Sequence, residues 1–144
     1  MNPRIPALLV GVAIALSAGQ ALAAASPVGT WYTQGKAAKV RIAPCGQKLC
    51  GTITWIRTQG GEPAASVKDE ANPNPALRSR PIVGLQMMRD FSPAGPGRWT
   101  GGKIYDPNSG RTYDSKMSLS PNGGLKVEGC VTVICQGQAW SPAD

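Results

Sequence analysis

Histidine is absent from the 144-residue sequence. Its absence removes the commonest general base, and with it the serine–histidine and cysteine–histidine pairs that activate nucleophiles. It also removes most zinc sites other than those built from cysteine alone. We therefore assign no catalytic residue, no metal site and no cofactor from the sequence, and expect a protein that is not an enzyme.

Long apolar runs are lacking beyond the N-terminus. Arg4 precedes an uncharged apolar run at residues 7–18, and the Ala-Leu-Ala of residues 21–23 fits a small-x-small cleavage site. The run is shorter than the ~20 residues that span a bilayer. The pattern predicts a signal peptide over residues 1–23 that is cleaved near Ala23, and a periplasmic or secreted product with no membrane span.

The remaining residues 24–144 suffice for one domain and are too few for two. Losing Arg4 leaves 14 basic against 8 acidic side chains, so the net charge falls from +7 to +6. These charges are scattered, and the aromatic residues are not interleaved with them as in single-strand binders. We expect a monomer that binds no nucleic acid, whose basic surface either contacts an anionic envelope polymer or only aids solubility.

The four cysteines form two C-x4-C pairs. An even number of cysteines in an exported chain indicates disulfides. We predict the local bonds Cys45 to Cys50 and Cys130 to Cys135, because each pair brackets one expected hairpin tip. A four-cysteine zinc site is the alternative.

The first expected hairpin lies in KVRIAPCGQKLCGTITWI, residues 39–56. Opposing the two cysteines places Ile42 opposite Ile53 and Val40 opposite Trp55. Large apolar residues then share one face, and lysine, arginine and threonine share the other, as in a half-buried antiparallel hairpin.

The second hairpin lies in GGKIYDPNSGRTYDSKM, residues 101–117. Asp-Pro-Asn-Ser followed by Gly110 is typical of a type I turn that ends in a left-handed residue. The expected cross-strand pairs are Lys103 with Asp114, Ile104 with Tyr113, and Asp106 with Arg111. Turn chemistry and charge pairing thus account for Asp106 and Asp114 as structural rather than catalytic residues.

A third hairpin is expected in LKVEGCVTVICQGQAW, residues 125–140. Its tip, residues 131–134, is apolar apart from one hydroxyl, whereas hairpin tips are usually polar. We expect the tip to pack under the sheet; contact with a ligand or a partner is the alternative.

Short strands joined by turns predict an all-β fold, a single small antiparallel up-and-down barrel of about eight strands with hairpins tipped by disulfides. The longest irregular segment, residues 58–81, is expected to form part of the rim. Trp31, Trp55 and Trp140 are expected inside the barrel or at its closed end. Trp99 is expected at the mouth.

Several motifs together resemble an exported bacterial family, domain of unknown function 2147: GTW at residue 29, CGQKLCGTITW, DEANPNPALRSRPIVGLQMM, WTGGKIYDPNSGRTYDSKM and CQGQAW. The resemblance spans nearly the whole mature chain. The GTW start is also similar to the G-x-W that opens lipocalin-like (calycin) barrels. Lipocalins place an arginine shortly after the last Trp, whereas Ser141 follows Trp140 here. The resemblance implies architecture and setting, but no reaction.

Two function classes fit these features. The first is a binding module for a small apolar or amphipathic ligand in the cell envelope, since an eight-stranded barrel can hold one small ligand. The second is an envelope interaction protein without a ligand cavity. A third, a carboxylate enzyme using Asp69 with Glu70 or Asp106 with Asp114, is disfavoured because these pairs do not converge. The candidate ligand-binding residues are Trp55, Asn72, Arg78, Arg80, Trp99 and Tyr113.

Overall fold

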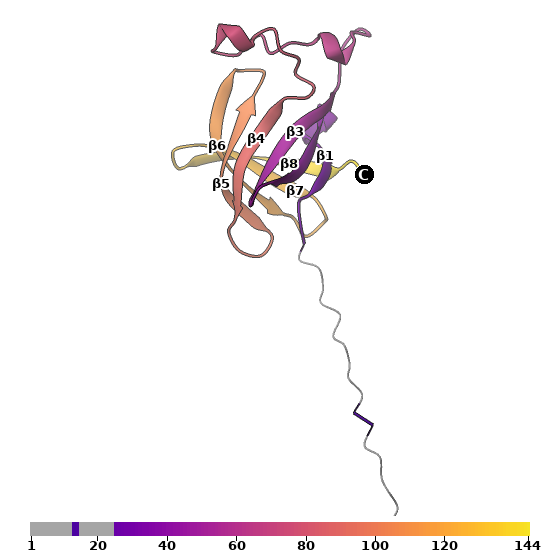
Figure 1. The fold of residues 1–144 in the computed structure, drawn as a ribbon, viewed down its shortest axis with the longest axis vertical. Helices are drawn as coiled ribbons and strands as arrows, with labels where there is room; N and C mark the ends of the chain where they lie inside the picture. Colours follow the sequence, from indigo (N-terminus) through magenta and orange to yellow (C-terminus); the bar gives the residue numbers. More distant parts are fainter. Residues whose placement is uncertain (1–12, 15–24) are drawn as a thin grey trace, which may run out of the picture.

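The computed structural model describes residues 13–14 and 25–144. Apart from residues 13 and 14, the predicted signal peptide and its cleavage site lie outside the described residues. From Gly29 onward the chain forms a closed barrel (Figure 1). Its strands are β1 (Gly29–Tyr32), β2 (Ala38–Cys45), β3 (Lys48–Ile56), β4 (Gln86–Pro93), β5 (Arg98–Asp106), β6 (Arg111–Leu119), β7 (Leu125–Val131) and β8 (Ile134–Pro142).

Each strand pairs antiparallel with the next strand in the chain, and β1 pairs with β8 to close the barrel. The expected up-and-down barrel is therefore confirmed. The helical segments are short 3-10 turns: η1 (Gln34–Lys36), η2 (Ala64–Ser66) and η3 (Pro75–Leu77). In the described part of the chain, no helix is long and apolar enough to cross a membrane.

The β5–β6 hairpin has the predicted register. Lys103 pairs with Asp114, Ile104 with Tyr113, and Asp106 with Arg111. The Asp106 carboxylate accepts hydrogen bonds from the Asn108 backbone N–H (2.9 Å) and the Ser109 hydroxyl (2.8 Å). Asp106 is thus a turn residue, and Asp114 forms an exposed ion pair with Lys103.

The predicted register of the β2–β3 hairpin is wrong by two residues. Cys45 pairs with Lys48, and Val40 pairs with Ile53. The chain makes a tight turn through Gly46, which has a φ of 63°, instead of the expected four-residue loop. Two-residue loops are the commonest hairpin connections, because the backbone twist of their usual turn types matches that of the flanking strands.

Trp55 does not lie inside the barrel, contrary to expectation, and is 38% exposed. Lys39 pairs with Trp55 and Val40 with Ile53, so Thr54 is an extra residue in β3. Such a bulge reverses the inward and outward alternation beyond it. Ile53 therefore points into the barrel, and Trp55 lies on the outer wall.

Both predicted disulfides are present, Cys45 to Cys50 and Cys130 to Cys135. The described residues include no free cysteine, so the zinc alternative is wrong. Cys130 and Cys135 are directly opposed across β7 and β8. The apolar tip beyond them is exposed rather than packed under the sheet, with Val133 92% exposed, because the two-residue turn carries it past the end of the sheet.

The barrel interior is filled by side chains. Trp31, Trp99 and Trp140 are buried there, so the expectation that Trp99 lines the mouth is wrong. Phe91 packs so closely on Gly102 that an added Cβ would meet its ring at 2.5 Å. The buried cluster consists of Trp31, Val40, Ile42, Ile53, Ile82, Leu85, Met88, Phe91, Trp99, Met117, Leu125, Val127 and Trp140.

The buried position of Trp31 predicts a large loss of stability on truncation. Its indole N–H donates a 2.8 Å hydrogen bond to the Pro27 carbonyl oxygen, and its ring fills the core. Trp31→Ala should lower the free energy of unfolding by about 3 to 5 kcal/mol, since it leaves a cavity. Trp55→Ala, on the outer wall, should cost no more than about 1 kcal/mol. Urea unfolding of both variants checks this; equal losses would contradict the assignment of Trp55 to the surface.

Candidate functional site

The segment between β3 and β4 folds over one end of the barrel. Figure 1 shows it above the β5–β6 hairpin, at the top of the view. A bridge between Lys68 and Pro81 and a hydrogen bond from the Ile82 N–H to the Val67 carbonyl oxygen (3.0 Å) close it on itself. Ile82 and Leu85 are buried in the core. The segment is therefore a fixed part of the structure.

Asp69 anchors this segment and is fully buried. One carboxylate oxygen accepts hydrogen bonds from the Asn72 amide (2.9 Å) and the Arg80 Nε (2.8 Å). The other accepts a 2.5 Å hydrogen bond from the Tyr105 hydroxyl on β5. Since a buried charge is costly unless it is paired and hydrogen-bonded, these three donors are what keep the carboxylate in place.

The pKa values reflect this arrangement. Burial alone would raise the pKa of Asp69, but the hydrogen bonds from Tyr105, Asn72 and Arg80, together with the charge of Arg80, hold it below its ordinary value of 3.8. The pKa of Tyr105 is raised to about 12, first by burial and then by the hydrogen bond to Asp69 and the negative charge of Asp69. At neutral pH the site therefore holds an ionised carboxylate and a neutral phenol.

Further contacts hold the segment together and place it against the β5–β6 tip. Within the segment, the Arg78 Nε donates a 2.8 Å hydrogen bond to the Asn72 carbonyl oxygen. Gly110, with a φ of 72°, lies so close to the segment that an added Cβ would be 1.9 Å from the Ala71 carbonyl oxygen. Only glycine fits there, because both the conformation and the space exclude a side chain.

A pocket of about 230 Å³ lies between this anchored segment and the barrel wall. Met88 on β4 and Ile104 on β5 pair on the inner face of the barrel. Because side chains alternate along a strand, their neighbours point outward: Arg89, Lys103 and Tyr105. The pocket is thus outside the barrel. It is lined by Asn72, Pro73, Arg80, Gln86, Met87, Arg89, Lys103, Tyr105, Gly110 and Thr112.

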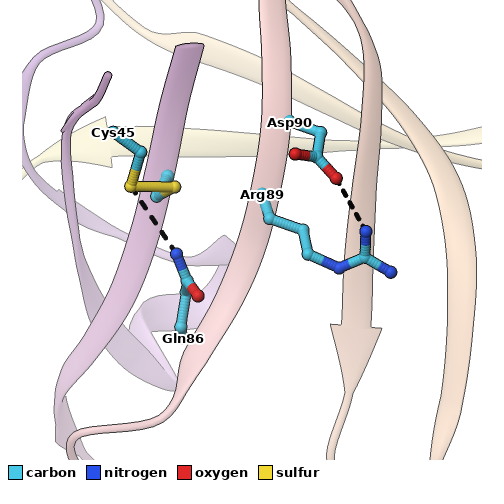
Figure 2. The surroundings of a disulfide bond; sticks show 5 residues. Cys45, Gln86, Arg89 and Asp90 are labelled. Atoms are coloured by element: carbon cyan, nitrogen blue, oxygen red, sulfur yellow. Dashed lines mark hydrogen bonds and ion pairs between the residues drawn. A yellow bond between two sulfur atoms is a disulfide. The ribbon is translucent and has the colours of Figure 1, made fainter. Parts of the chain in front are cut away.

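Three cations line the pocket, and each has an acidic neighbour. Arg80 pairs with the buried Asp69, Lys103 with Asp114, and Arg89 with Asp90 at 2.7 Å. Figure 2 shows the Arg89 side chain turned toward the Asp90 carboxylate, and Gln86 turned toward the Cys45 to Cys50 disulfide, its Nε2 3.6 Å from the Cys45 sulfur. Together with Met87, the cations make a wall suited to a small anion with a short apolar part.

The structure brings together only some of the residues expected from the sequence. Asn72 and Arg80 line the pocket, and Arg78 supports it through the Asn72 carbonyl. Trp99 is in the core and Trp55 is on the outer wall beside Tyr32.

Tyr113 lies away from this pocket. It lines a second hollow of about 460 Å³ between the β5–β6 and β7–β8 tips, together with Arg111, Val131 and Thr132.

Sequence reasoning missed the residues that complete the pocket. Tyr105, Arg89 and Lys103 lie on strands whose outward positions are ordinarily solvated, and nothing in their spacing indicates a ligand. The role of Asp69 was also missed. Residues 69–80 contain two carboxylates, Asp69 and Glu70, followed by two arginines, Arg78 and Arg80, which is the one hint of an internal ion pair in this segment.

The carboxylates do not form a reactive pair. The Asp69 carboxylate accepts hydrogen bonds from three donors. Asp106 lies in a turn, and Asp114 lies on the outer face of a strand. Among the described residues, no group of three or more histidine, cysteine, aspartate or glutamate side chains could hold a metal ion.

The fold is that of a lipocalin-like barrel. A solved structure titled "Protein HP1028 from the human pathogen Helicobacter pylori belongs to the lipocalin family" is similar to this chain with a TM-score of 0.71. The two share 24% sequence identity, and the similarity covers 81% of this chain and 82% of the other.

Residues 29–141 match the family described as an uncharacterized protein conserved in bacteria, DUF2147, and the chain belongs to that family. No curated protein matches the chain.

The buried Asp69 predicts a specific loss of stability in acid. Its folded-state pKa is below the ordinary 3.8, so the stability it contributes is present above that pH and is lost as the pH falls through the folded pKa. Asp69→Asn should cost about 3 kcal/mol at neutral pH, because Arg80 loses its charged partner. Below the folded pKa the variant and the wild type should converge.

Urea midpoints measured between neutral pH and strong acid check this expectation. Asp114→Asn is the matched control, since its exposed ion pair should contribute at most about 1 kcal/mol at any pH. Equal losses in the two variants would contradict the anchoring role of Asp69.

The raised pKa of Tyr105 predicts a second pH effect, in alkali. The wild type should lose stability as the pH rises from 10 to about 12, because the phenol ionises at a lower pH in the unfolded chain than in the folded one. Tyr105→Phe should remove this decline when urea midpoints are measured over that range.

Proposed function

We propose that the protein is a small-ligand binding protein of the bacterial cell envelope, and that its ligand is a small amphipathic anion held in the outer pocket. The observation that carries the proposal is that Arg80, Arg89, Lys103 and Met87 line one pocket, beside a segment fixed by a buried carboxylate. A rigid pocket loses little conformational entropy on binding, which favours affinity.

The extracytoplasmic setting is supported by two disulfides in a chain that belongs to a bacterial family. Disulfides persist in oxidising compartments such as the periplasm and are rare in the cytosol. The sequence pattern of residues 1–23 supports export with cleavage near Ala23. We therefore place the binding activity in the periplasm or outside the cell.

The pocket is a better ligand site than the barrel interior for a physical reason. Lipocalin-like barrels suggest an internal ligand, but here the interior contains a packed cluster that includes Trp99, Trp140, Ile82 and Leu85. An eight-stranded barrel is only just wide enough for its own side chains unless they are small. The outer pocket needs no rearrangement of the core.

Binding is also a better proposal than catalysis. Catalysis without histidine would need a carboxylate free to exchange a proton near the working pH. The pKa of the buried Asp69 is instead held below its ordinary value by its partners. Such a group stays ionised and serves to position Arg80 and Tyr105.

Octanoate is a suitable probe, with 1-octanol as the uncharged control of equal chain length. Isothermal titration should detect octanoate binding and no octanol binding. Replacing both Arg89 and Lys103 by glutamine should weaken octanoate binding about tenfold or more, because hydrogen bonds to charged groups are lost. Lys116→Gln, which removes an exposed charge on the outer face of β6, should leave the affinity unchanged.

Native mass spectrometry of the oxidised protein complements the titration. A retained small anion that is lost in the double variant would support the proposal. Octanol binding as tight as octanoate binding, or equal affinity in the double variant and in Lys116→Gln, would refute it.

A further inference from the structure

The first three strands carry positive charge only. Residues 25–61 contain five basic side chains and no acidic one: Lys36, Lys39, Arg41, Lys48 and Arg57. None of these five takes part in an ion pair found among the described residues. The chain that forms β1, β2 and β3 therefore presents an uncompensated basic surface, on a part of the barrel distinct from the outer pocket.

Two aromatic side chains lie on this surface. Tyr32 and Trp55 meet edge to face, with ring centroids 6.3 Å apart and planes at 86°. The bulge at Thr54 is what brings Trp55 to the outer wall. The other three tryptophans are buried, so the bulge exposes an indole that a regular strand would have kept inside. Bulges that re-aim a side chain are often found next to functional sites.

Lysine side chains surround the two rings. The Lys39 ammonium lies 5.1 Å from the centre of the Tyr32 ring and 5.7 Å from that of Trp55, and the Lys36 ammonium lies 5.3 Å from the Tyr32 ring. The turn that carries Lys36 is fixed, because the Arg57 guanidinium donates hydrogen bonds to the Gly35 and Lys36 carbonyl oxygens. The cluster is therefore held in place.

The same outer face continues along the strands. Lys39 and Arg41 are two residues apart on β2, on the side opposite the buried Val40 and Ile42, so their Cα atoms are spaced by about 7 Å. Arg41 pairs with Thr30 on β1 and Thr52 on β3, which adds hydroxyl groups beside the guanidinium. Aromatic rings, cations and hydroxyls thus form a row along the wall of the barrel.

We propose that this row, the Tyr32–Trp55 face, binds an acidic carbohydrate polymer. Aromatic rings pack against the C–H faces of sugar rings, the lysines and Arg41 meet carboxylate or phosphate groups, and the threonines suit sugar hydroxyls. A row of charges spaced along β2, with Lys36 beside it in η1, fits a repeating ligand better than a single small ion. This surface does not depend on the outer pocket or its ligand.

A lipid bilayer fits this face less well. Peripheral membrane binding relies on apolar side chains that project into the interface. Trp55 is only 38% exposed and is flanked by Tyr32 and Lys39, so little of its ring can project into a bilayer. Single-stranded nucleic acid also stacks on aromatic rings beside cations, and the test must distinguish it from a polysaccharide.

Polygalacturonate, a carboxylate-bearing polysaccharide, is the probe, and neutral dextran is its control. Biolayer interferometry with the oxidised protein should detect polygalacturonate binding that weakens as salt is added, and no dextran binding. Trp55→Ala should weaken binding about tenfold. Trp55→Phe, which keeps a ring, should restore most of the affinity.

Charge-matched variants locate the site. Lys39→Gln and Arg41→Gln should each weaken binding, whereas Lys116→Gln, with the same charge change on β6, should not. Arg89→Gln in the outer pocket should also have no effect, so the two proposals can fail independently. Because Trp55 is the exposed tryptophan, bound polymer should reduce acrylamide quenching of the wild type and not of Trp55→Phe.

Three outcomes would overturn the proposal. One is equal polygalacturonate binding by the wild type and Trp55→Ala. Another is an equal loss of binding in Lys39→Gln and Lys116→Gln, which would indicate a general charge effect. The third is Trp55-dependent binding to anionic phosphatidylglycerol vesicles or to oligothymidylate without binding to polygalacturonate, which would assign the face to a different partner. Circular dichroism and urea midpoints confirm that each variant is folded.

Discussion

Closure of eight strands into one small barrel is the constraint on which the rest of the structure depends. Closure removes every exposed sheet edge, and it also fixes an interior about wide enough for side chains alone. Here large residues such as Phe91 and Trp140 take up that interior, and Gly102 is required where the Phe91 ring approaches the backbone. Additional aromatic and polar groups must then lie outside the wall. The outer pocket and the Tyr32–Trp55 face are both consequences of a filled barrel.

The connecting segment between β3 and β4 depends on a second, local interaction. Its buried apolar side chains, Ile82 and Leu85, lie next to β4, and the rest of the segment is held by Asp69, which accepts hydrogen bonds from the segment and from Tyr105 on β5. A buried carboxylate of this kind specifies one arrangement, because any displacement leaves a charge without partners. Arg80 is positioned by the same contact and carries its guanidinium to the pocket. Stability of the segment and shape of the pocket are therefore coupled through one side chain.

Turn chemistry explains why the hairpins differ in how well they could be predicted. In β5–β6 the Asp-Pro-Asn-Ser-Gly sequence favours one turn, and the Lys103 to Asp114 pairing follows from it. In β2–β3 a four-residue loop and a two-residue turn through Gly46 both keep Val40, Ile42 and Ile53 on one face. A shift of two residues preserves the alternation, so the hydrophobic pattern could not choose between them. The bulge at Thr54 also has no signal in the sequence. Whether Trp55 points into the barrel or away from it depends on packing in the closed barrel.

The sequence by itself determined the all-β barrel, the order of its hairpins and the pairing of its cysteines, because alternation, turn residues and Cys spacing are local properties. It also pointed to the long segment that holds Asn72 and Arg80, both of which line the outer pocket. Only the tertiary structure decided that Trp99 is buried, that the 131–134 tip is exposed, and that Tyr105, Arg89 and Lys103 line one pocket with Arg80. These outcomes join residues far apart in the chain, and they follow from the volume inside the closed barrel and from the hydrogen bonds of one buried carboxylate, neither of which local patterns encode.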